Sequence, residues 1–127
     1  MTRQFLKFLV AGGIAAVANF ASRMVFSMFL PYATAVVLAF GVGLTLAFAL
    51  NRLFVFPMSR NPVHIQAFWF FAVNMLALAQ TLGVSVLLVH ILPRVGMAWH
   101  VEEIAHAAGI VVPIFTSYIG HRTLTFR

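Results

Sequence analysis

The sequence has no cysteine and only two carboxylate side chains, Glu102 and Glu103, in its 127 residues. Without cysteine, a disulfide framework, a thiolate metal site and a thiol nucleophile are all excluded. The two glutamates are adjacent, whereas acid–base catalysis by two carboxylates needs groups roughly 5–9 Å apart in different environments. We therefore expect no enzyme of the usual kinds, no catalytic residue and no cofactor.

Apolar residues dominate what is present. They make up 63% of the chain, and charged residues make up 8%. Soluble proteins have about 45–50% and about 25%, and a small soluble domain has too little interior to bury so much apolar surface. The expected solvent is therefore lipid. The net charge of +6 comes from basic residues scattered singly, not from a basic face, so no nucleic-acid partner is expected.

Four apolar segments are each long enough to cross a bilayer as a helix, which takes about 20 residues. They are separated by Pro31, by the turn-rich loop 57–62, and by Pro93 with the polar stretch after it. The expected spans are residues 8–30, 34–56, 66–92 and 104–124. The sequence thus predicts an all-α polytopic membrane protein, a single domain over residues 1–127 with four transmembrane helices.

The two halves of the chain repeat each other. The segment beginning at Gln4 aligns with the one beginning at Gln66, and Asn51 aligns with His121. Each half is then a helical hairpin. Because a two-span unit returns to its starting side, the two hairpins are expected to run parallel rather than inverted.

The distribution of Lys and Arg over the short loops predicts the orientation. Only Arg94 falls in a loop on the side away from the termini. The basic residues on the side of the termini are Arg3, Lys7, Arg52, Arg60, Arg122 and Arg127. Both termini are therefore expected in the cytoplasm, with the protein in the inner (cytoplasmic) membrane.

Arg23 lies well inside the first expected span. A charge there costs several kcal/mol unless it reaches the headgroups or is paired, so such a residue is a functional hypothesis by default. Two interpretations stay open. Either Arg23 extends to the outer headgroups, or it faces inward and holds a phosphate, whose oxygens match its planar guanidinium. Asn19 lies one turn earlier on the same helix face.

Thin stripes of polar side chains follow all four spans and predict a polar groove. Packing and hydrogen bonding between helices also explain any one of these residues. The candidate groove residues are Asn19, Asn51, Asn74, Thr81, Ser85, His106, Ser117 and His121. Arg52 and Arg122, at the ends of the two hairpins, are either interface anchors or a cationic pair that receives anionic lipid headgroups.

The stretch from His100 to His106 has a faint likeness to a metal site. Glu103 and His106 form a Glu-x-x-His motif, but di-iron bundles need two such motifs and further carboxylates. We therefore expect no metal site, and interpret the acidic residues as the start of a helix, near the positive end of its dipole.

Two motifs are similar to those of a known family. Residues 8–19 carry a Gly pair followed by an Asn, and Asn51-Arg52 is followed by aromatic residues. Both resemble the GtrA-like family of small four-helix membrane proteins, and the resemblance covers residues 3–126. The second half departs from the family pattern, because His121 stands where an Asn is expected.

The resemblance implies a role in cell-surface polysaccharide synthesis, in which polyprenyl-phosphate-linked sugars are flipped across the cytoplasmic membrane. Arg52 and Arg122 would receive the lipid phosphate at the inner face, and Arg23 would meet it nearer the outer face. The implied partners are this sugar lipid, membrane lipid and a glycosyltransferase, with a homodimer left open. Two other functions stay open: a non-transporting accessory subunit of a glycosyltransferase, and a small ion channel.

Overall fold

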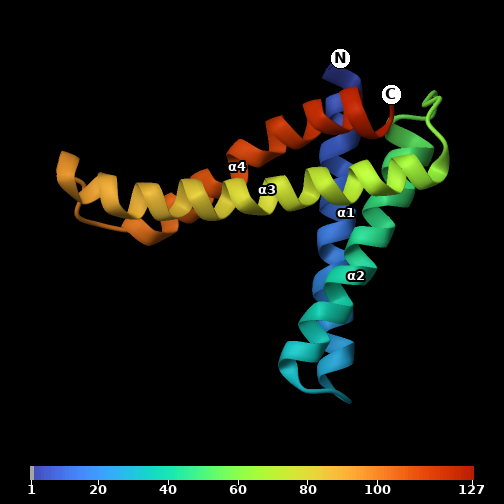
Figure 1. Ribbon diagram of the computed structural model, residues 1–127. Helices are drawn as coiled ribbons and strands as arrows, with labels where there is room; N and C mark the ends of the chain where they lie inside the picture. Colours follow the sequence, from blue (N-terminus) through green and yellow to red (C-terminus); the bar gives the residue numbers. More distant parts are fainter. Residues whose placement is uncertain (1) are drawn as a thin grey trace. The chain divides into compact units, whose positions relative to one another are not determined.

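The computed structural model describes residues 2–127, with side chains from Arg3 onward (Figure 1). Within this range the α-helices are α1 (Thr2–Ser27), α2 (Tyr32–Leu50), α3 (Val63–Ile91) and α4 (Val101–Gly120). Two π-helices, η1 (Asn51–Val55) and η3 (His121–Thr125), continue α2 and α4, and the 3₁₀ turn η2 (Leu92–Val95) follows α3. The described residues contain no β-strand, and the predicted all-α class is confirmed.

Each of the four helices is long and apolar enough to cross a membrane, as predicted. The candidate spans are Arg3–Ser27, Tyr32–Val55, Val63–Val95 and Val101–Thr125. The first helix ends earlier than expected, at Ser27 rather than at residue 30. The reason is the turn over residues 28–30 ahead of Pro31, since the residue before a proline disfavours helix.

The chain divides into two compact units, Met1–Ser59 and Arg60–Arg127. Helices α1 and α2 lie side by side in unit 1, and α3 and α4 lie side by side in unit 2 (Figure 1). Each unit is therefore a helical hairpin, and each corresponds to one copy of the repeat seen in the sequence.

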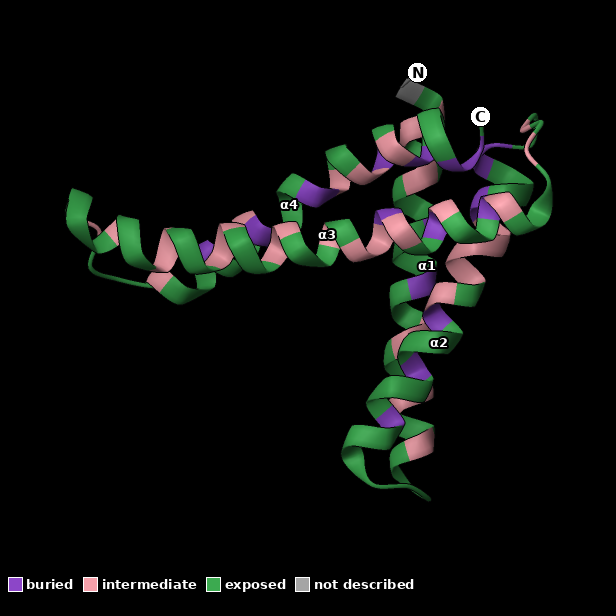
Figure 2. Cartoon of the chain, in the orientation of Figure 1, coloured by how far each residue is buried: buried purple, intermediate pink, exposed green. Residues whose placement is uncertain are grey.

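Buried positions recur along α1 and α2 in unit 1 (Figure 2), and all of them are small residues. The buried residues along these two helices are Ala11, Ala15, Ala35, Ala39 and Gly43. A Cβ atom at Gly43 would lie 2.8 Å from the Asn19 Cβ and 3.2 Å from the Ala15 carbonyl oxygen. The two helix backbones thus approach closely, as small residues allow in membrane proteins.

Unit 2 has the same kind of contact between α3 and α4. Here Gly109 faces Ser85 and Thr81, and a Cβ atom at Gly109 would lie 2.8 Å from the Thr81 carbonyl oxygen. The Ser85 hydroxyl donates a hydrogen bond across the contact to the Ala105 carbonyl oxygen, at 3.3 Å. Nearer the end of α4, a Cβ atom at Gly120 would lie 3.1 Å from a methyl group of Val73.

Both hairpins end in the same wide turn. In η1 the Phe56 N–H donates to the Asn51 carbonyl oxygen at 2.8 Å, and in η3 the Phe126 N–H donates to the His121 carbonyl oxygen at 2.8 Å. The equivalent residues of the two turns are buried alike, Asn51 with His121 and Phe56 with Phe126. Such π turns are rare in proteins overall, and those that do occur are often found at functional sites.

Candidate functional site

Arg23 is half-buried near the end of α1 and is held between two aromatic rings. Its guanidinium carbon lies 5.3 Å from the centroid of the Phe20 ring and 5.5 Å from that of Tyr32. Both distances fall within the range of a cation–π interaction. A guanidinium held in this way still carries its N–H donors in its own plane, in the fork geometry that suits phosphate oxygens.

The positions of Phe20 and Tyr32 follow from local structure. Phe20 lies three residues before Arg23 on the same helix, so the two side chains share a face. Tyr32 is the first residue of α2, and the hairpin turn brings it back to α1. The Arg23 guanidinium is therefore in contact with a residue that directly follows the α1–α2 turn.

Arg52 and Arg122 lie at equivalent places in η1 and η3, and both are exposed. Each follows a buried polar residue, Asn51 or His121, which belongs to the inner side of the same turn. The two arginines thus project from the end of each hairpin, where the sequence analysis expects them.

Four of the eight candidate groove residues bond to a carbonyl oxygen one turn earlier on their own helix. Asn51 donates to the Ala47 carbonyl oxygen at 2.7 Å, Asn74 to that of Phe70 at 2.8 Å, and Thr81 to that of Ala77 at 3.0 Å. Ser117 donates to the Pro113 carbonyl oxygen in the same way. Bonds of this kind satisfy polar side chains where water is absent.

Three of the four remaining candidates lie in different settings. Asn19 is half-buried beside Gly43, at the α1–α2 contact. Ser85 joins α3 to α4, as described above, and His106 is exposed on α4. Within each unit, the described contacts of Asn19 and Ser85 are therefore contacts between helices, and one continuous groove of all eight residues stays a prediction.

The two π turns differ at both of their buried positions. In η3 the His121 Nδ1 atom lies 2.9 Å from the Thr125 hydroxyl oxygen, and both residues are buried. In η1 the equivalent residues are Asn51 and Val55, and among the described residues the side-chain oxygen of Asn51 has no hydrogen-bond partner. His121 also stacks on Phe70, with ring centroids 4.6 Å apart. The departure from the family pattern at His121 is therefore accommodated within its own unit.

The polar stretch before α4 is exposed. The His100 Nδ1 atom lies 3.7 Å from a Glu103 carboxylate oxygen, and both side chains are largely exposed to solvent. Glu102 and Glu103 lie in the first turn of α4, where a helix favours negative charge. This is the helix start that the sequence analysis expects.

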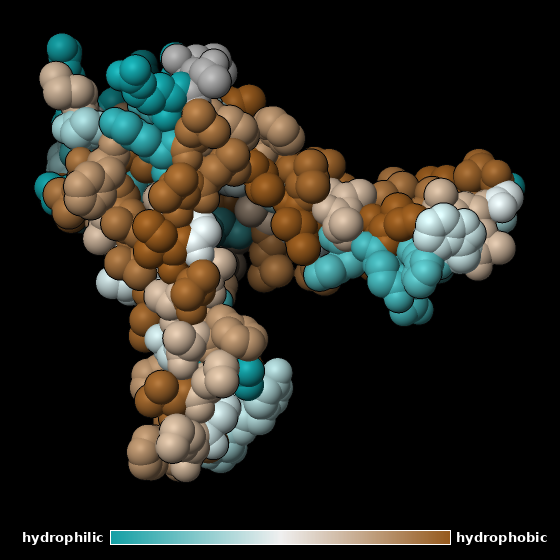
Figure 3. Space-filling view, turned by 180° about the vertical axis from the view of Figure 1, so that it is seen from behind, coloured by the Kyte–Doolittle hydropathy of each residue, from teal (hydrophilic) through white to brown (hydrophobic). Residues whose placement is uncertain are grey.

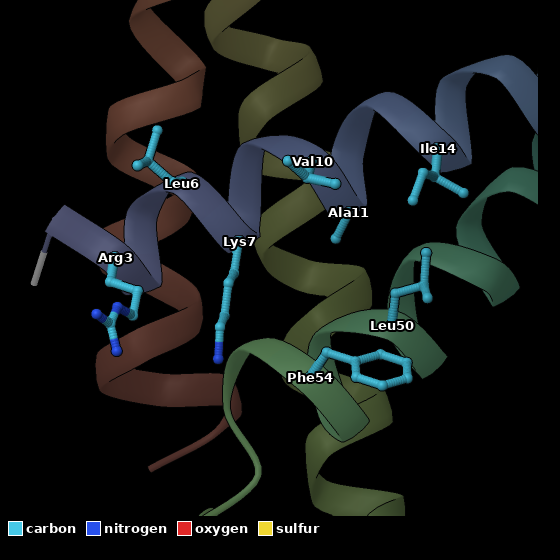
Figure 4. A pocket seen from close by; sticks show the side chains of 8 residues that line it. All are labelled: Arg3, Leu6, Lys7, Val10, Ala11, Ile14, Leu50 and Phe54. Carbon is cyan, nitrogen blue, oxygen red and sulfur yellow. The ribbon is translucent and has the colours of Figure 1, made fainter.

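A groove on unit 1 is a feature that the sequence analysis missed (Figure 4). Its volume is 490 Å³, and its lining residues are Arg3, Leu6, Lys7, Val10, Ala11, Ile14, Leu50 and Phe54. Arg3 and Lys7 extend the same way from α1, while Leu50 and Phe54 form the opposite wall (Figure 4). The i, i+4 spacing of the two cations, which places them on one helix face, is the signal in the sequence that points to this site.

The charges of unit 1 are not balanced within it. The only Asp or Glu side chains of the chain are Glu102 and Glu103, and both belong to α4 of unit 2. The basic side chains of unit 1 therefore have no carboxylate of their own unit to pair with. Any carboxylate or other anion that pairs with them must therefore come from outside the unit.

The fold and its surface define a class. Apolar side chains cover most of the visible surface, and hydrophilic ones gather mainly near helix ends (Figure 3). Together with four membrane-length helices, this makes the chain a multi-pass, all-α membrane protein. The family model described as GtrA/DPMS, transmembrane domain, matches residues 7–126. The chain belongs to this family, which confirms the resemblance read from its motifs. A comparison with curated proteins finds no significant match.

Proposed function

We propose that this protein translocates a polyprenyl-phosphate-linked sugar across the cytoplasmic membrane, for the synthesis or modification of cell-surface polysaccharide. The family to which the chain belongs is associated with the handling of lipid-linked sugars. The proposal adds that this chain moves the lipid, and that it does so without acting as an enzyme.

The observation that carries the proposal is the setting of Arg23. It is a half-buried cation inside the candidate span Arg3–Ser27, and its unit contains no carboxylate. A charged residue within a membrane span is costly and is a functional hypothesis by default. The rings of Phe20 and Tyr32 lower that cost and fix the guanidinium. The sugar lipid carries a phosphate, an anion that a guanidinium can bind through two parallel hydrogen bonds.

Arg52 and Arg122 supply the other end of the path. Both are exposed at the ends of the hairpins, on the side that the Lys and Arg distribution assigns to the cytoplasm. Basic residues there attract anionic lipid headgroups. In the proposed mechanism, the sugar-phosphate head moves between these arginines and Arg23 along the polar side chains, while the polyprenyl tail stays in lipid.

The proposed transport is passive. The sequence has no Gly-rich nucleotide-binding loop, and its only two carboxylates lie in the first turn of α4. Net movement would then follow the concentration gradient that is set up when the sugar is used on the far side. A requirement for ATP or for a proton gradient would contradict this part of the mechanism.

The test uses the purified protein in liposomes that contain a short-chain polyprenyl-phosphate sugar. The rate at which the sugar becomes accessible to an impermeant reagent is measured for the wild type, for Arg23→Gln and for the loop control Arg60→Gln. We expect rapid exposure with the wild type and Arg60→Gln, and a rate lower by about tenfold or more with Arg23→Gln, the loss of one charged hydrogen-bonding group.

The other outcomes separate the competing functions. Wild-type exposure that Arg23→Gln leaves unchanged would keep translocation and assign Arg23 to the outer headgroups. Exposure no faster than in protein-free liposomes, with several sugars, would reject translocation. The function would then be that of an accessory subunit, and co-purification with a glycosyltransferase is the measurement that supports it.

A further inference from the structure

The groove of unit 1 has a cationic end and an apolar run. Arg3 and Lys7 lie at the end nearest the N-terminus of α1, and the lining then continues through Val10 to Ile14 (Figure 4). At 1.5 Å per residue, the helix from Arg3 to Ile14 covers roughly 16 Å. That is about half of a hydrocarbon core roughly 30 Å thick. The groove therefore extends through about one leaflet, with its charge at the membrane surface.

The cationic end belongs to unit 1 alone. In the repeat alignment that pairs Gln4 with Gln66, Arg3 matches Ile65 and Lys7 matches Trp69. The same helix face in unit 2 therefore carries no cation at these two positions. Positive-inside topology explains basic residues near a helix end, but it does not explain why two of them line a groove together with apolar side chains.

We propose that this groove binds a single-chain isoprenoid lipid that ends in a phosphomonoester, and that it prefers this lipid to phosphodiester lipids. The isoprenoid identity of the tail rests on the proposed function; the preference for a phosphomonoester rests on the charges. Two cations with no carboxylate in their unit match a phosphomonoester, whose charge is about −1.5 to −2 at neutral pH. Phosphodiesters, which include the sugar-linked lipid and phosphatidylglycerol, carry a single negative charge at the phosphate.

This ligand is the carrier lipid without its sugar. When a glycosyltransferase moves the sugar to an acceptor hydroxyl, the bond between the sugar carbon and the phosphate oxygen breaks and a bond to the acceptor oxygen forms. The acceptor gives up its proton, and the carrier leaves as the phosphomonoester. The groove would thus bind the product of the reaction that consumes the translocated lipid.

Lys7 offers a direct readout because it is the only lysine of the chain. The full chain is placed in nanodiscs of phosphatidylcholine, with or without a short-chain polyprenyl phosphate, and is treated with an amine-acylating reagent. Peptide mass spectrometry then measures the acylation rate at Lys7. A phosphate bound between Arg3 and Lys7 should slow this rate about tenfold. Phosphatidylglycerol or the sugar-linked diester at the same concentration should protect Lys7 much less.

Two pairs of variants test the two ends of the groove. Arg3→Gln leaves Lys7 available as the readout and should abolish the protection, whereas Arg60→Gln should preserve it. Phe54→Ala removes part of the apolar wall and should raise the lipid concentration needed for protection. Leu53→Ala is the matched control, since Leu53 is also exposed in η1 but does not line the groove.

Protection that persists in Arg3→Gln, or that is equally strong with either diester, would overturn the proposal. The proposed function is measured separately in the same preparations. Translocation without protection of Lys7 would reject the groove and leave transport standing. Protection without translocation would keep the groove as a binding site for lipid phosphate and reject transport.

Discussion

Gly43 provides a sharp test of the packing in unit 1. A Cβ atom there would lie 2.8 Å from the Asn19 Cβ, whereas carbon atoms in contact prefer about 3.5–4.0 Å. In Gly43→Ala, the new Cβ atom would therefore lie about 0.7–1.2 Å too close to the Asn19 Cβ. The Asn19 Cβ is fixed to the backbone of α1 and the next neighbour is the Ala15 carbonyl oxygen, at 3.2 Å, so neither can rotate away. The helices must separate.

Gly41 is the matched control on the same helix, because a Cβ atom there would meet nothing within 4 Å. Both substitutions gain the same helix propensity of Ala over Gly, about 1 kcal/mol. The difference between them therefore reports the overpacking alone, for which we expect about 1–3 kcal/mol in favour of Gly41→Ala. The assay is unfolding in mixed micelles titrated with sodium dodecyl sulfate, followed by circular dichroism. Equal unfolding free energies for the two variants would refute the close approach at Gly43.

Two further predictions concern the α3–α4 contact of unit 2. Gly109→Ala should be destabilised by about 1–3 kcal/mol relative to Gly83→Ala in the same assay, because of these two glycines only Gly109 faces the other helix at contact distance; equal stabilities would contradict this. Thr116 donates a hydrogen bond of 2.5 Å to the side-chain oxygen of Gln80, so Thr116→Val should cost about 0.6–1.7 kcal/mol. Thr116→Ser retains the hydroxyl and should restore the unfolding free energy, and a loss of the same size in both variants would assign the effect to packing.

The helices could be predicted from the sequence because few backbone structures are stable in lipid. A chain that is 63% apolar must satisfy every backbone group within its spans, and helices do so. Pro31 marked the first turn, and α2 begins directly after it. The alignment of Asn51 with His121 also placed two equivalent hairpin ends. Local composition and spacing were sufficient for all of this.

The π turns could not be predicted from local composition and spacing. A wide turn keeps the composition of an α-helix and changes only which carbonyl accepts each N–H, as in the Phe56-to-Asn51 bond. Its formation depends on how the buried side chains of the turn pack. Short sequence motifs predicted that a helix ends near Arg52, but they carry no information on the width of its last turn.

The candidate sites show a similar division. The energetic cost of a charge in lipid was enough to select Arg23, and helix spacing places Phe20 beside it. Tyr32 joins them only through the geometry of the hairpin turn. The groove at Lys7 needs a wall from Phe54, which is remote in the sequence. A pattern along one helix therefore identifies one wall of such a site and leaves the other undetermined.

The two hairpins share many of their buried positions but differ where the groove lies. In unit 2, Val73 packs against Gly120, and in the repeat alignment these residues match Ala11 and Leu50 of unit 1. The large and the small residue have thus exchanged helices. In unit 2 the absence of a side chain at Gly120 admits Val73 against the backbone of α4, whereas in unit 1 both Ala11 and Leu50 line the groove. Both copies of the repeat therefore pack their two helices closely at this place. Lys7, the cation beside the groove of unit 1, is replaced by Trp69 in unit 2, so the proposed lipid-phosphate site belongs to unit 1 alone.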